Sequence, residues 1–238
     1  MYSNKSKLWV VIPAAGVGKR MKVNHPKQYL TIHQKTIIEL TLQRFLSSPH
    51  VAGIVVAISD GDEYWSDIYS QFGDQQCLIQ VVQGGKERCH SVLNGLQFLQ
   101  TLAHADDWVM VHDAARPCLH EEDIQRLIDQ LWNHAVGGVL ALPVADTLKL
   151  SGGNLRVKKT VDRSHLWRAL TPQMFRFQKL LNALKSAIRQ PEKITDEASA
   201  MEYCGYEPVL IEGRWDNIKI THPQDLAQAE IILEAQKR

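Results

Sequence analysis

The sequence predicts an α/β fold in which helices cover both faces of a mainly parallel β-sheet. Short, β-branched apolar runs alternate with segments of helical apolar spacing along most of the 238 residues, a pattern typical of βαβ crossovers. The hydrophobic content of 45% is ample for one large core. In parallel sheets, ligands bind beyond the carboxyl ends of the strands, so we expect the functional residues in the loops that follow each strand.

Five short apolar runs are predicted to be buried strands, because they are too short and too β-branched for helices. They are Leu8–Ile12, Gly53–Ile58, Leu78–Val82, Trp108–Val111 and Gly138–Val144. A sixth short strand is predicted at 216–221. Apolar residues at helical spacing predict helices, within 38–46, 92–99, 124–131 and 177–188 and after Pro223.

One stretch departs from this alternation. From Leu148 to Val161 polar and apolar residues alternate on both sides of Ser151–Asn154, which predicts a hairpin with a four-residue turn. A two-stranded ribbon is marginally stable by itself, so we expect it to pack on something, such as another subunit. The chain is therefore predicted to be one domain, 1–238, with an appendage at about 145–170.

Charge and cysteine usage restrict the function classes. A net charge of +1, from 27 basic and 26 acidic residues, argues against a nucleic-acid binder, which needs a basic excess. The four cysteines form no C-x-x-C pair, which argues against a cysteine-pair zinc or redox site. The apolar run Leu8–Ile12 near the polar N-terminus is too short for a signal core or a membrane span. These features predict a protein of the cytoplasm that contacts neither membrane nor nucleic acid.

The loop Pro13–Met21 follows the first predicted strand and is rich in residues with little or no side chain. Such residues let backbone N–H groups approach phosphate oxygens closely, and Lys19 and Arg20 add positive charge. The spacing is neither G-x-G-x-x-G nor G-x-x-x-x-G-K-[ST], which disfavours dinucleotide and Walker sites. Lys27, paired with Arg20, suggests a second phosphate clamp. For the loop Pro13–Met21, the alternative to phosphate binding is a tight turn that binds no ligand.

Two further loops carry candidate groups. Gly84 and Gly85 precede a predicted helix, an arrangement that favours anions, and Ser91 either caps that helix or contacts a base or ribose. Asp113, at the end of the fourth predicted strand, is suited to bind Mg²⁺ that touches phosphate oxygens. Arg116 either holds a second anion or forms a salt bridge with Asp113.

Two other residues in these segments are interpreted differently. His112 is predicted to be structural, because the sequence offers it no partner for base catalysis. Lys219, between apolar residues of the predicted strand at 216–221, is either a charge that solvates an edge strand or a group that faces the cleft.

Together these motifs resemble the 2-C-methyl-D-erythritol 4-phosphate cytidylyltransferase family, from about Trp9 to the last helix. The resemblance extends through the segments Pro143–Thr147, Thr160–Arg163, Leu170–Gln173 and Thr195–Ala200. It implies a Rossmann-like, three-layer nucleotidyltransferase fold with a protruding β-arm, and a homodimer formed through the arms. The pair Cys89-His90 stands at a position that varies in the family, and Lys19 replaces a frequent arginine.

The resemblance also implies the reaction and the role of each residue. The family transfers CMP from CTP to 2-C-methyl-D-erythritol 4-phosphate, which gives 4-diphosphocytidyl-2-C-methyl-D-erythritol and pyrophosphate, with Mg²⁺ or Mn²⁺. The implied catalytic residues are Arg20, Lys27, Arg163 and Lys219, with Arg163 supplied by the partner's arm. The implied nucleotide-binding residues are Pro13, Ala14, Ala15, Gly16, Gly18, Gly85, Ser91 and Ala114. The implied substrate-binding residues are Asp113, Arg116, Thr147, Arg163, Thr171, Thr195 and Lys219, and Asp113 is also the implied metal ligand.

Three alternatives remain at the level of sequence. A ribitol-5-phosphate cytidylyltransferase shares the phosphate loop and the Asp113–Pro117 segment, but the set Thr147, Arg163, Thr171 and Thr195 follows the methylerythritol pattern. A non-catalytic nucleotide-binding protein would bind CTP without turnover. A dinucleotide-dependent oxidoreductase is disfavoured by the missing glycine fingerprint.

Overall fold

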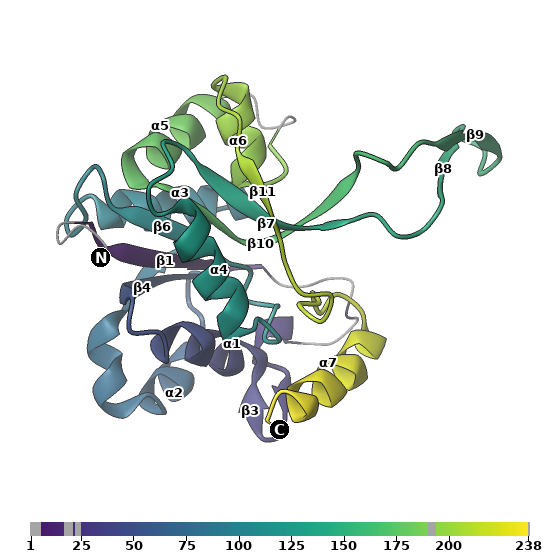
Figure 1. Cartoon of the computed structure of the whole chain (residues 1–238). Helices are drawn as coiled ribbons and strands as arrows, with labels where there is room; N and C mark the ends of the chain where they lie inside the picture. The colour runs from purple at the N-terminus through teal and green to yellow at the C-terminus, as the bar shows by residue number, and fades with distance from the viewer. Residues whose placement is uncertain (1–5, 17–20, 22–24, 190–193, 238) are drawn as a thin grey trace.

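The computed structural model describes residues 6–16, 21, 25–189 and 194–237, and within them a seven-stranded sheet lies between two layers of helices (Figure 1). The strand order is β11-β7-β10-β6-β1-β4-β5. The strands are β1 (Leu8–Pro13), β4 (Val51–Ile58), β5 (Ile79–Gln83), β6 (Trp108–Val111), β7 (Gly137–Pro143), β10 (Trp167–Arg176) and β11 (Val209–Glu212). The α/β fold class predicted from the sequence is confirmed.

The sheet is parallel except for β10, which runs antiparallel to both of its neighbours, β6 and β7. From β1 the chain first builds outward through β4 and β5 on one side, and later adds β6 on the other side. A reversal of this kind leaves a crevice beyond the carboxyl ends of β1 and β6, which is where open α/β sheets bind ligands.

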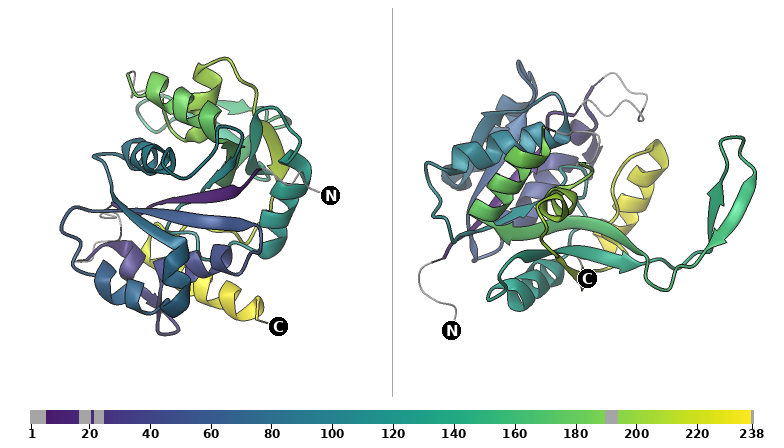
Figure 2. Two further views of the ribbon diagram at one scale, coloured as in Figure 1. Left: turned by 90° about the vertical axis from the view of Figure 1, so that its left-hand side faces the viewer. Right: turned by 90° about the horizontal axis from the view of Figure 1, so that it is seen from above.

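The helices divide between the two faces of the sheet (Figure 2). On one face lie α3 (Arg88–Leu99), α5 (Phe177–Ala187) and α6 (Glu197–Tyr203), whose apolar residues pack on Val11, Val55 and Val109. On the other lie α1 (Ile37–Leu46), α2 (Trp65–Ser70) and α4 (Glu121–Leu131), which share a core with Val10, Val56 and Met110. The alternation of side chains along each strand thus supplies both cores, as expected for a sheet that is covered on both faces.

A third, smaller apolar cluster fixes the C-terminal segment beside the carboxyl edge of the sheet. Helix α7 (Pro223–Ala235) places Ala229 and Leu233 against Ile37 of α1 and against Ile220. The packing of Ile220 in this cluster therefore holds the segment 216–221 next to the site.

Helix α1 begins with a capping box, in which Thr36 accepts from the Glu39 N–H and the Glu39 carboxylate accepts from the Thr36 N–H.

The remaining elements are short. They are the 3-10 helices η2 (Lys27–Tyr29) and η3 (Gly73–Leu78), the paired strands β2 (Thr31–Ile32) and β3 (Lys35–Thr36), and the arm strands β8 (Leu148–Ser151) and β9 (Val157–Val161). Figure 1 shows β8 and β9 standing well away from the main body, at the end of an extended ribbon. The predicted hairpin is confirmed, but its turn is displaced, because Ser151 pairs with Val157 and the connection runs through 152–156.

One sequence prediction about strands is wrong, and two strands were not predicted. The segment 216–221 forms no strand, because it reaches its neighbour through a single backbone bond, from Ile220 N–H to the Ala115 carbonyl at 2.9 Å. Strands β10 and β11 were not predicted, since β10 includes Pro172 and several polar residues, and β11 is an edge strand with exposed Val209 and Leu210. In the described part of the chain, no helix has the length and apolar character needed to span a bilayer.

Candidate active site

A cavity of about 290 Å³ opens beyond the carboxyl ends of β1 and β6. Four separate segments form its wall, namely the loop after β1, the start of η2, the β5–α3 connection and the loop after β6, and Lys219 joins them from the C-terminal part of the chain. The lining residues that the sequence predicted are Pro13, Ala14, Ala15, Gly16, Lys27, Gly85, Ser91, Asp113, Ala114 and Lys219. Residues up to 206 positions apart in the sequence therefore meet in one place.

The loop after β1 begins as the sequence predicts. The Ala14 N–H continues the sheet by donating to the Ala57 carbonyl at 2.7 Å, and the Gln28 side-chain amide donates to the Ala14 carbonyl. A Cβ on Gly16 would meet no described atom within 4 Å. The predicted residues Gly18, Lys19 and Arg20 lie outside the described residues.

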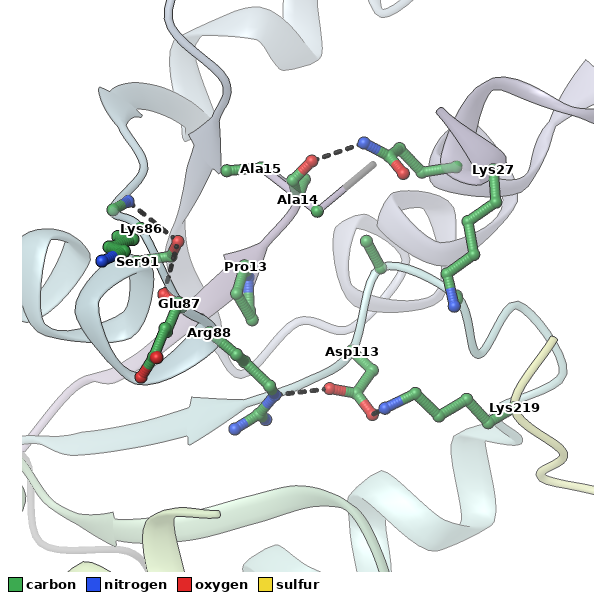
Figure 3. A pocket seen from close by; sticks show the side chains of 15 residues that line it. Pro13, Ala14, Ala15, Lys27, Lys86, Glu87, Arg88, Ser91, Asp113 and Lys219 are labelled. Carbon is green, nitrogen blue, oxygen red and sulfur yellow. Dashed lines mark hydrogen bonds and ion pairs between the residues drawn. The ribbon is translucent and has the colours of Figure 1, made fainter. Parts of the chain in front are cut away.

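Lys27 is the first residue of η2 and projects into the cavity (Figure 3). Its Nζ donates to the Ile220 carbonyl at 2.8 Å. This bond joins the N-terminal half of the site to the segment that carries Lys219. The ammonium group is thereby held at the cavity wall.

The β5–α3 connection supplies backbone groups to the opposite wall. The Gly85 N–H donates to Ser91 Oγ at 3.0 Å, and that hydroxyl donates to the Glu87 carbonyl at 3.3 Å. Glu87 is the residue that caps α3, and Ser91 lies one turn inside the helix, so the capping interpretation of Ser91 is wrong. A Cβ on Gly84 would collide with Ala15, which explains why the two small-residue loops can pack face to face.

Asp113 is the electrostatic centre of the site, and Figure 3 shows Arg88 and Lys219 reaching it from opposite sides. Its Oδ1 accepts from Arg88 Nε at 2.8 Å, and its Oδ2 lies 2.8 Å from Lys219 Nζ. Burial by itself raises the carboxyl pKa, but Arg88, Lys219 and then Arg116 outweigh it and hold the pKa of Asp113 far below its usual range. The carboxylate is therefore ionised at any physiological pH.

Arg88 and Glu197 are functional candidates that the sequence analysis did not select. Arg88 donates through Nη1 and Nη2 to the two carboxylate oxygens of Glu197, at 2.7 and 3.0 Å, while its Nε holds Asp113. The Glu197 side chain is 1% exposed. Both residues stand in segments that carried the family resemblance, but their pairing joins positions 109 residues apart, which spacing alone does not reveal.

His112 is structural, as predicted. It is fully buried, its Nε2 contacts the Arg116 carbonyl at 3.1 Å, and its Nδ1 contacts Thr171 Oγ1 at 3.1 Å. Thr171 Oγ1 in turn accepts from the Asp113 N–H. Burial lowers the pKa of His112 to about 4, so the imidazole is neutral and positions the loop that carries Asp113.

The Arg116 side chain is buried and contacts other groups of the protein. Its Nη1 donates to the Asn217 carbonyl at 2.7 Å, and its Nε lies 3.5 Å from Asp113 Oδ2. The salt bridge that the sequence offered as one alternative is therefore present. Burial lowers the pKa of Arg116 against the opposing effect of Asp113. Arg116 still lies at the edge of the site, because its neighbours Ala114 and Ala115 line the cavity.

Five of the predicted acceptor-binding residues do not line the cavity. Thr147 and Arg163 are exposed on the arm ribbon, and Thr195 is exposed just before α6. Arg116 and Thr171 are buried, and the Thr171 hydroxyl is already used by Asp113 and His112. Within the described chain, the arm residues therefore lie apart from this cavity.

The donor set around Asp113 fits Mg²⁺. Magnesium in nucleotide enzymes is commonly held by one or two carboxylates together with substrate phosphates, and Asp113 faces the open cavity beside the glycine-rich loop. Its two oxygens are held by Arg88 and Lys219. A bound cation would therefore compete with these two side chains for the same carboxylate.

Comparison with known proteins agrees with this geometry. The family model described as 2-C-methyl-D-erythritol 4-phosphate cytidylyltransferase matches residues 8–235. A protein of that name from Vibrio vulnificus is 50% identical over 238 residues, which is 100% of this chain and 99% of its relative. One from Pseudomonas aeruginosa is 51% identical over 223 residues, covering 93% of this chain and 94% of its own.

Solved structures give the same result. A crystal structure of 4-diphosphocytidyl-2C-methyl-D-erythritol synthase superposes with a TM-score of 0.84 at 41% identity, covering 97% of this chain and 100% of its own. The Francisella tularensis 2-C-methyl-D-erythritol 4-phosphate cytidylyltransferase has a TM-score of 0.82 at 38% identity, covering 95% and 100%. Because the likeness extends over the whole length in sequence and in fold, it includes the loops that build the cavity. The chain belongs to the 2-C-methyl-D-erythritol 4-phosphate cytidylyltransferase family of nucleotidyltransferases.

Proposed function

We propose that this chain transfers CMP from CTP to 2-C-methyl-D-erythritol 4-phosphate, with release of pyrophosphate. The observation that carries the proposal is the meeting of Lys27, Lys219 and Asp113 with the small-residue loop after β1 in one cavity. Cations beside a backbone cradle suit a triphosphate, and an acidic group among them suits the metal that accompanies it.

The reaction needs no general base. A phosphate monoester has its second pKa near ~6, so the attacking oxygen of the acceptor is already deprotonated at neutral pH. That oxygen attacks the α-phosphorus of CTP, the bond from this phosphorus to the bridging oxygen breaks, and pyrophosphate carries away the electron pair. A neutral His112 with both ring nitrogens engaged accords with a site that moves no proton.

The main barrier is electrostatic, because two anions must meet while charge builds at the α-phosphate. Two unit charges 4 Å apart repel by about 4 kcal/mol at an effective dielectric near 20. Lys27 and Lys219 line the cavity, and we propose that they offset this repulsion and hold the reactants in line. Arg20 belongs to the same proposal through the family resemblance.

Magnesium is part of the proposal, and Mn²⁺ is an alternative ion. Asp113 would hold the ion, which would neutralise phosphate charge and orient the triphosphate. The chain's own contribution is to keep Asp113 ionised, through Arg88 and Lys219. Lys219, released from Asp113 when the ion arrives, would be able to contact the acceptor phosphate.

We further propose a homodimer in which a second copy's arm brings Arg163 to the acceptor. Leu150, Leu155 and Val157, at the end of the arm, are 44%, 94% and 64% exposed, and exposed apolar groups on a marginal two-stranded ribbon favour a protein partner. Arg163 and Thr147 lie on this ribbon rather than in the pocket of their own subunit.

A cytoplasmic location is also proposed. The four cysteines Cys77, Cys89, Cys118 and Cys204 have free thiols, which is typical of a reducing compartment. Nucleotide substrates are abundant in the same compartment. Fractionation of cells that express the native chain, with detection by antibody, would check this location.

The decisive test supplies the purified chain with radiolabelled CTP, Mg²⁺ and either 2-C-methyl-D-erythritol 4-phosphate or ribitol 5-phosphate. We expect labelled 4-diphosphocytidyl-2-C-methyl-D-erythritol and one equivalent of pyrophosphate with the first acceptor only. Turnover with ribitol 5-phosphate alone would assign the sister activity. Binding of CTP without pyrophosphate release from either acceptor would make the chain a non-catalytic nucleotide-binding protein.

A further inference from the structure

The turn that begins α3 brings three different metal-binding side chains together. Cys89 Sγ lies 3.9 Å from Glu87 Oε2 and 3.7 Å from His90 Nδ1, and His90 Nδ1 lies 4.0 Å from Glu87 Oε2. All three donor atoms thus form one nearly equilateral triangle. The sequence analysis considered only cysteine pairs, so it did not identify a metal-binding triad that contains a single cysteine.

The size of this triangle suits a tetrahedral zinc ion. Zinc lies about 2.3 Å from a cysteine sulfur and about 2.0–2.2 Å from imidazole nitrogen or carboxylate oxygen, so the donors of a tetrahedral site stand roughly 3.3–3.6 Å apart. The observed separations of 3.7–4.0 Å exceed this range by a few tenths of an ångström. Small side-chain rotations would close the gap, because the His90 and Glu87 side chains are 34% and 56% exposed.

The donor types select a soft ion over magnesium. Thiolate and imidazole favour zinc and its neighbours in the transition series, whereas Mg²⁺ prefers oxygen ligands. Three protein donors with one open position match the ligand number of zinc sites that keep a water molecule. Zinc binding would expel the Cys89 thiol proton to solvent.

The charges around the triad both oppose and favour a cation. The N-terminus of α3 and the neighbouring Lys86 and Arg88 are unfavourable. Arg88, however, is balanced by two carboxylates, Asp113 and Glu197. Glu87 and a Cys89 thiolate would supply two negative charges directly to the ion, so the immediate ligand shell is neutral overall with a divalent cation.

The triad adjoins the proposed nucleotide pocket. Glu87 lines the cavity together with Gly85, Lys86 and Arg88, and Figure 3 shows Glu87 on the same turn as Ser91. A Cβ on Gly85 would collide with the His90 Cβ, so His90 lies directly behind the glycine whose N–H bonds to Ser91. An ion that fixes Glu87, Cys89 and His90 would therefore fix the wall of the pocket.

We propose that Glu87, Cys89 and His90 form a zinc site whose occupation changes the affinity of the adjacent pocket for CTP, because Glu87 lines that pocket. The site is separate from Asp113, so its zinc would not be the catalytic ion. The binding of zinc stands on geometry alone, while its effect on CTP rests on the proposed function.

The first experiment tests binding without reference to activity. The full-length chain, reduced and metal-free, is titrated with Co²⁺, whose thiolate complex gives a sulfur-to-cobalt charge-transfer band, and then with Zn²⁺, which should displace it. We expect one equivalent of Co²⁺ to produce the band, and we expect Cys89→Ser to abolish it. Cys204→Ser and Cys77→Ser, which alter exposed thiols elsewhere, should leave it unchanged. Absence of the band, or its survival in Cys89→Ser, would overturn the site.

The second experiment tests the effect on the pocket. CTP affinity is measured by calorimetry in excess Mg²⁺, with and without one equivalent of Zn²⁺. We expect the CTP affinity of the wild type to change at least tenfold (about 1.4 kcal/mol) and that of Cys89→Ser to stay the same, with Cys204→Ser behaving as wild type. Equal changes in wild type and Cys89→Ser would place the effective zinc elsewhere, and no change in either would refute the coupling to the pocket. If zinc binds but CTP does not bind at all, the proposed function fails rather than the metal site.

Discussion

At the scale of single residues, the site is built around one ionised carboxylate that the protein surrounds with cations. Asp113 contacts Arg88 and Lys219 at 2.8 Å each, and Arg116 lies 3.5 Å away. This excess of positive charge is suited to phosphate groups that arrive with their own negative charge. Residues that touch this centre should therefore affect turnover more than they affect folding.

Lys27 is the clearest residue for testing that view. Lys27→Ala should lower kcat by about 10²–10³, the usual cost of one group that stabilises a developing charge. Lys27 is at the surface of the cavity rather than in the apolar core, so the thermal midpoint should change much less than kcat. Steady-state kinetics and calorimetric unfolding measure the two effects. Lys35→Ala, which removes an exposed lysine that bonds to Gln43, is the matched control, and a kcat close to wild type in Lys27→Ala would show that the assigned role is wrong.

His112 predicts a dependence of stability on pH. Burial lowers its pKa from 6.5 to about 4, so between these values the unfolded chain binds a proton that the folded chain does not. Stability is therefore lost as pH falls from 6.5 towards 4, by up to about 3 kcal/mol from this group. Urea unfolding across this range should show a shallower pH dependence for His112→Asn than for wild type, although His112→Asn is less stable throughout. His165→Asn, at an exposed position, should keep the wild-type slope, and equal slopes in all three proteins would refute the assignment.

At the scale of elements, the site depends on contacts between the start of α3 and the start of a helix that follows much later in the chain. Helix α6 begins at Glu197, whose carboxylate takes two bonds from Arg88, and Arg88 then bonds to Asp113. Asp196, the capping residue of α6, and Gln173 of β10 hold this helix start in place. The helix thus orients Arg88 without touching the cavity.

Glu197→Gln should separate this positioning role from mere structural support. Without the Glu197 carboxylate, the charge of Arg88 is balanced by Asp113 alone. Mg²⁺ must then compete with a stronger Arg88–Asp113 ion pair for the Asp113 carboxylate. We expect the Mg²⁺ concentration for half-maximal activity to rise by about tenfold to a hundredfold, the usual cost of losing an outer partner of a metal ligand. Glu202→Gln, at an exposed position of the same helix, is the control. If Glu197→Gln lowers only the thermal midpoint and leaves the Mg²⁺ dependence unchanged, Glu197 is structural.

At the scale of the whole molecule, the proposed acceptor contacts on the arm and the proposed nucleotide pocket lie on different parts of the chain. Arg163 stands on the arm ribbon, whereas Lys27 lines the pocket in the body. If the arm of one copy completes the site of another, two inactive variants with substitutions in different places should complement each other in a mixed dimer.

A mixing experiment tests this arrangement. Lys27→Ala and Arg163→Ala are each expected to be nearly inactive. After unfolding and refolding together in equal amounts, half of the dimers are mixed and each mixed dimer has one intact site, so about a quarter of wild-type activity should return. Sedimentation velocity would check that dimers form. If the mixture stays as inactive as its components while dimers form, Arg163 does not act across the interface.

The sequence by itself determined much of the fold. The strands β1, β4, β5, β6 and β7 were predicted within one or two residues, because short runs of β-branched apolar residues favour strands. The predicted burial is wrong for β5, which lies at the edge of the sheet and leaves Val81 37% exposed. The loops after β1, β5 and β6 could also be selected, since parallel strands present their carboxyl ends at one edge. The family followed from the motifs in these loops, and the comparisons confirm it.

Only the tertiary structure decided the rest. The pairing of Arg88 with Glu197, the bond from Lys27 to Ile220, and the use of the Thr171 hydroxyl by His112 and Asp113 all join distant positions, and no local periodicity encodes such pairings. Segment 216–221 has the apolar alternation of a strand, but it begins in a turn at Asp216 and bonds to the loop after β6 through Ile220 and Ala115, so it lies beside the site without joining the sheet. Local sequence chooses a conformation for each segment, whereas packing against the rest of the chain decides which side chains meet.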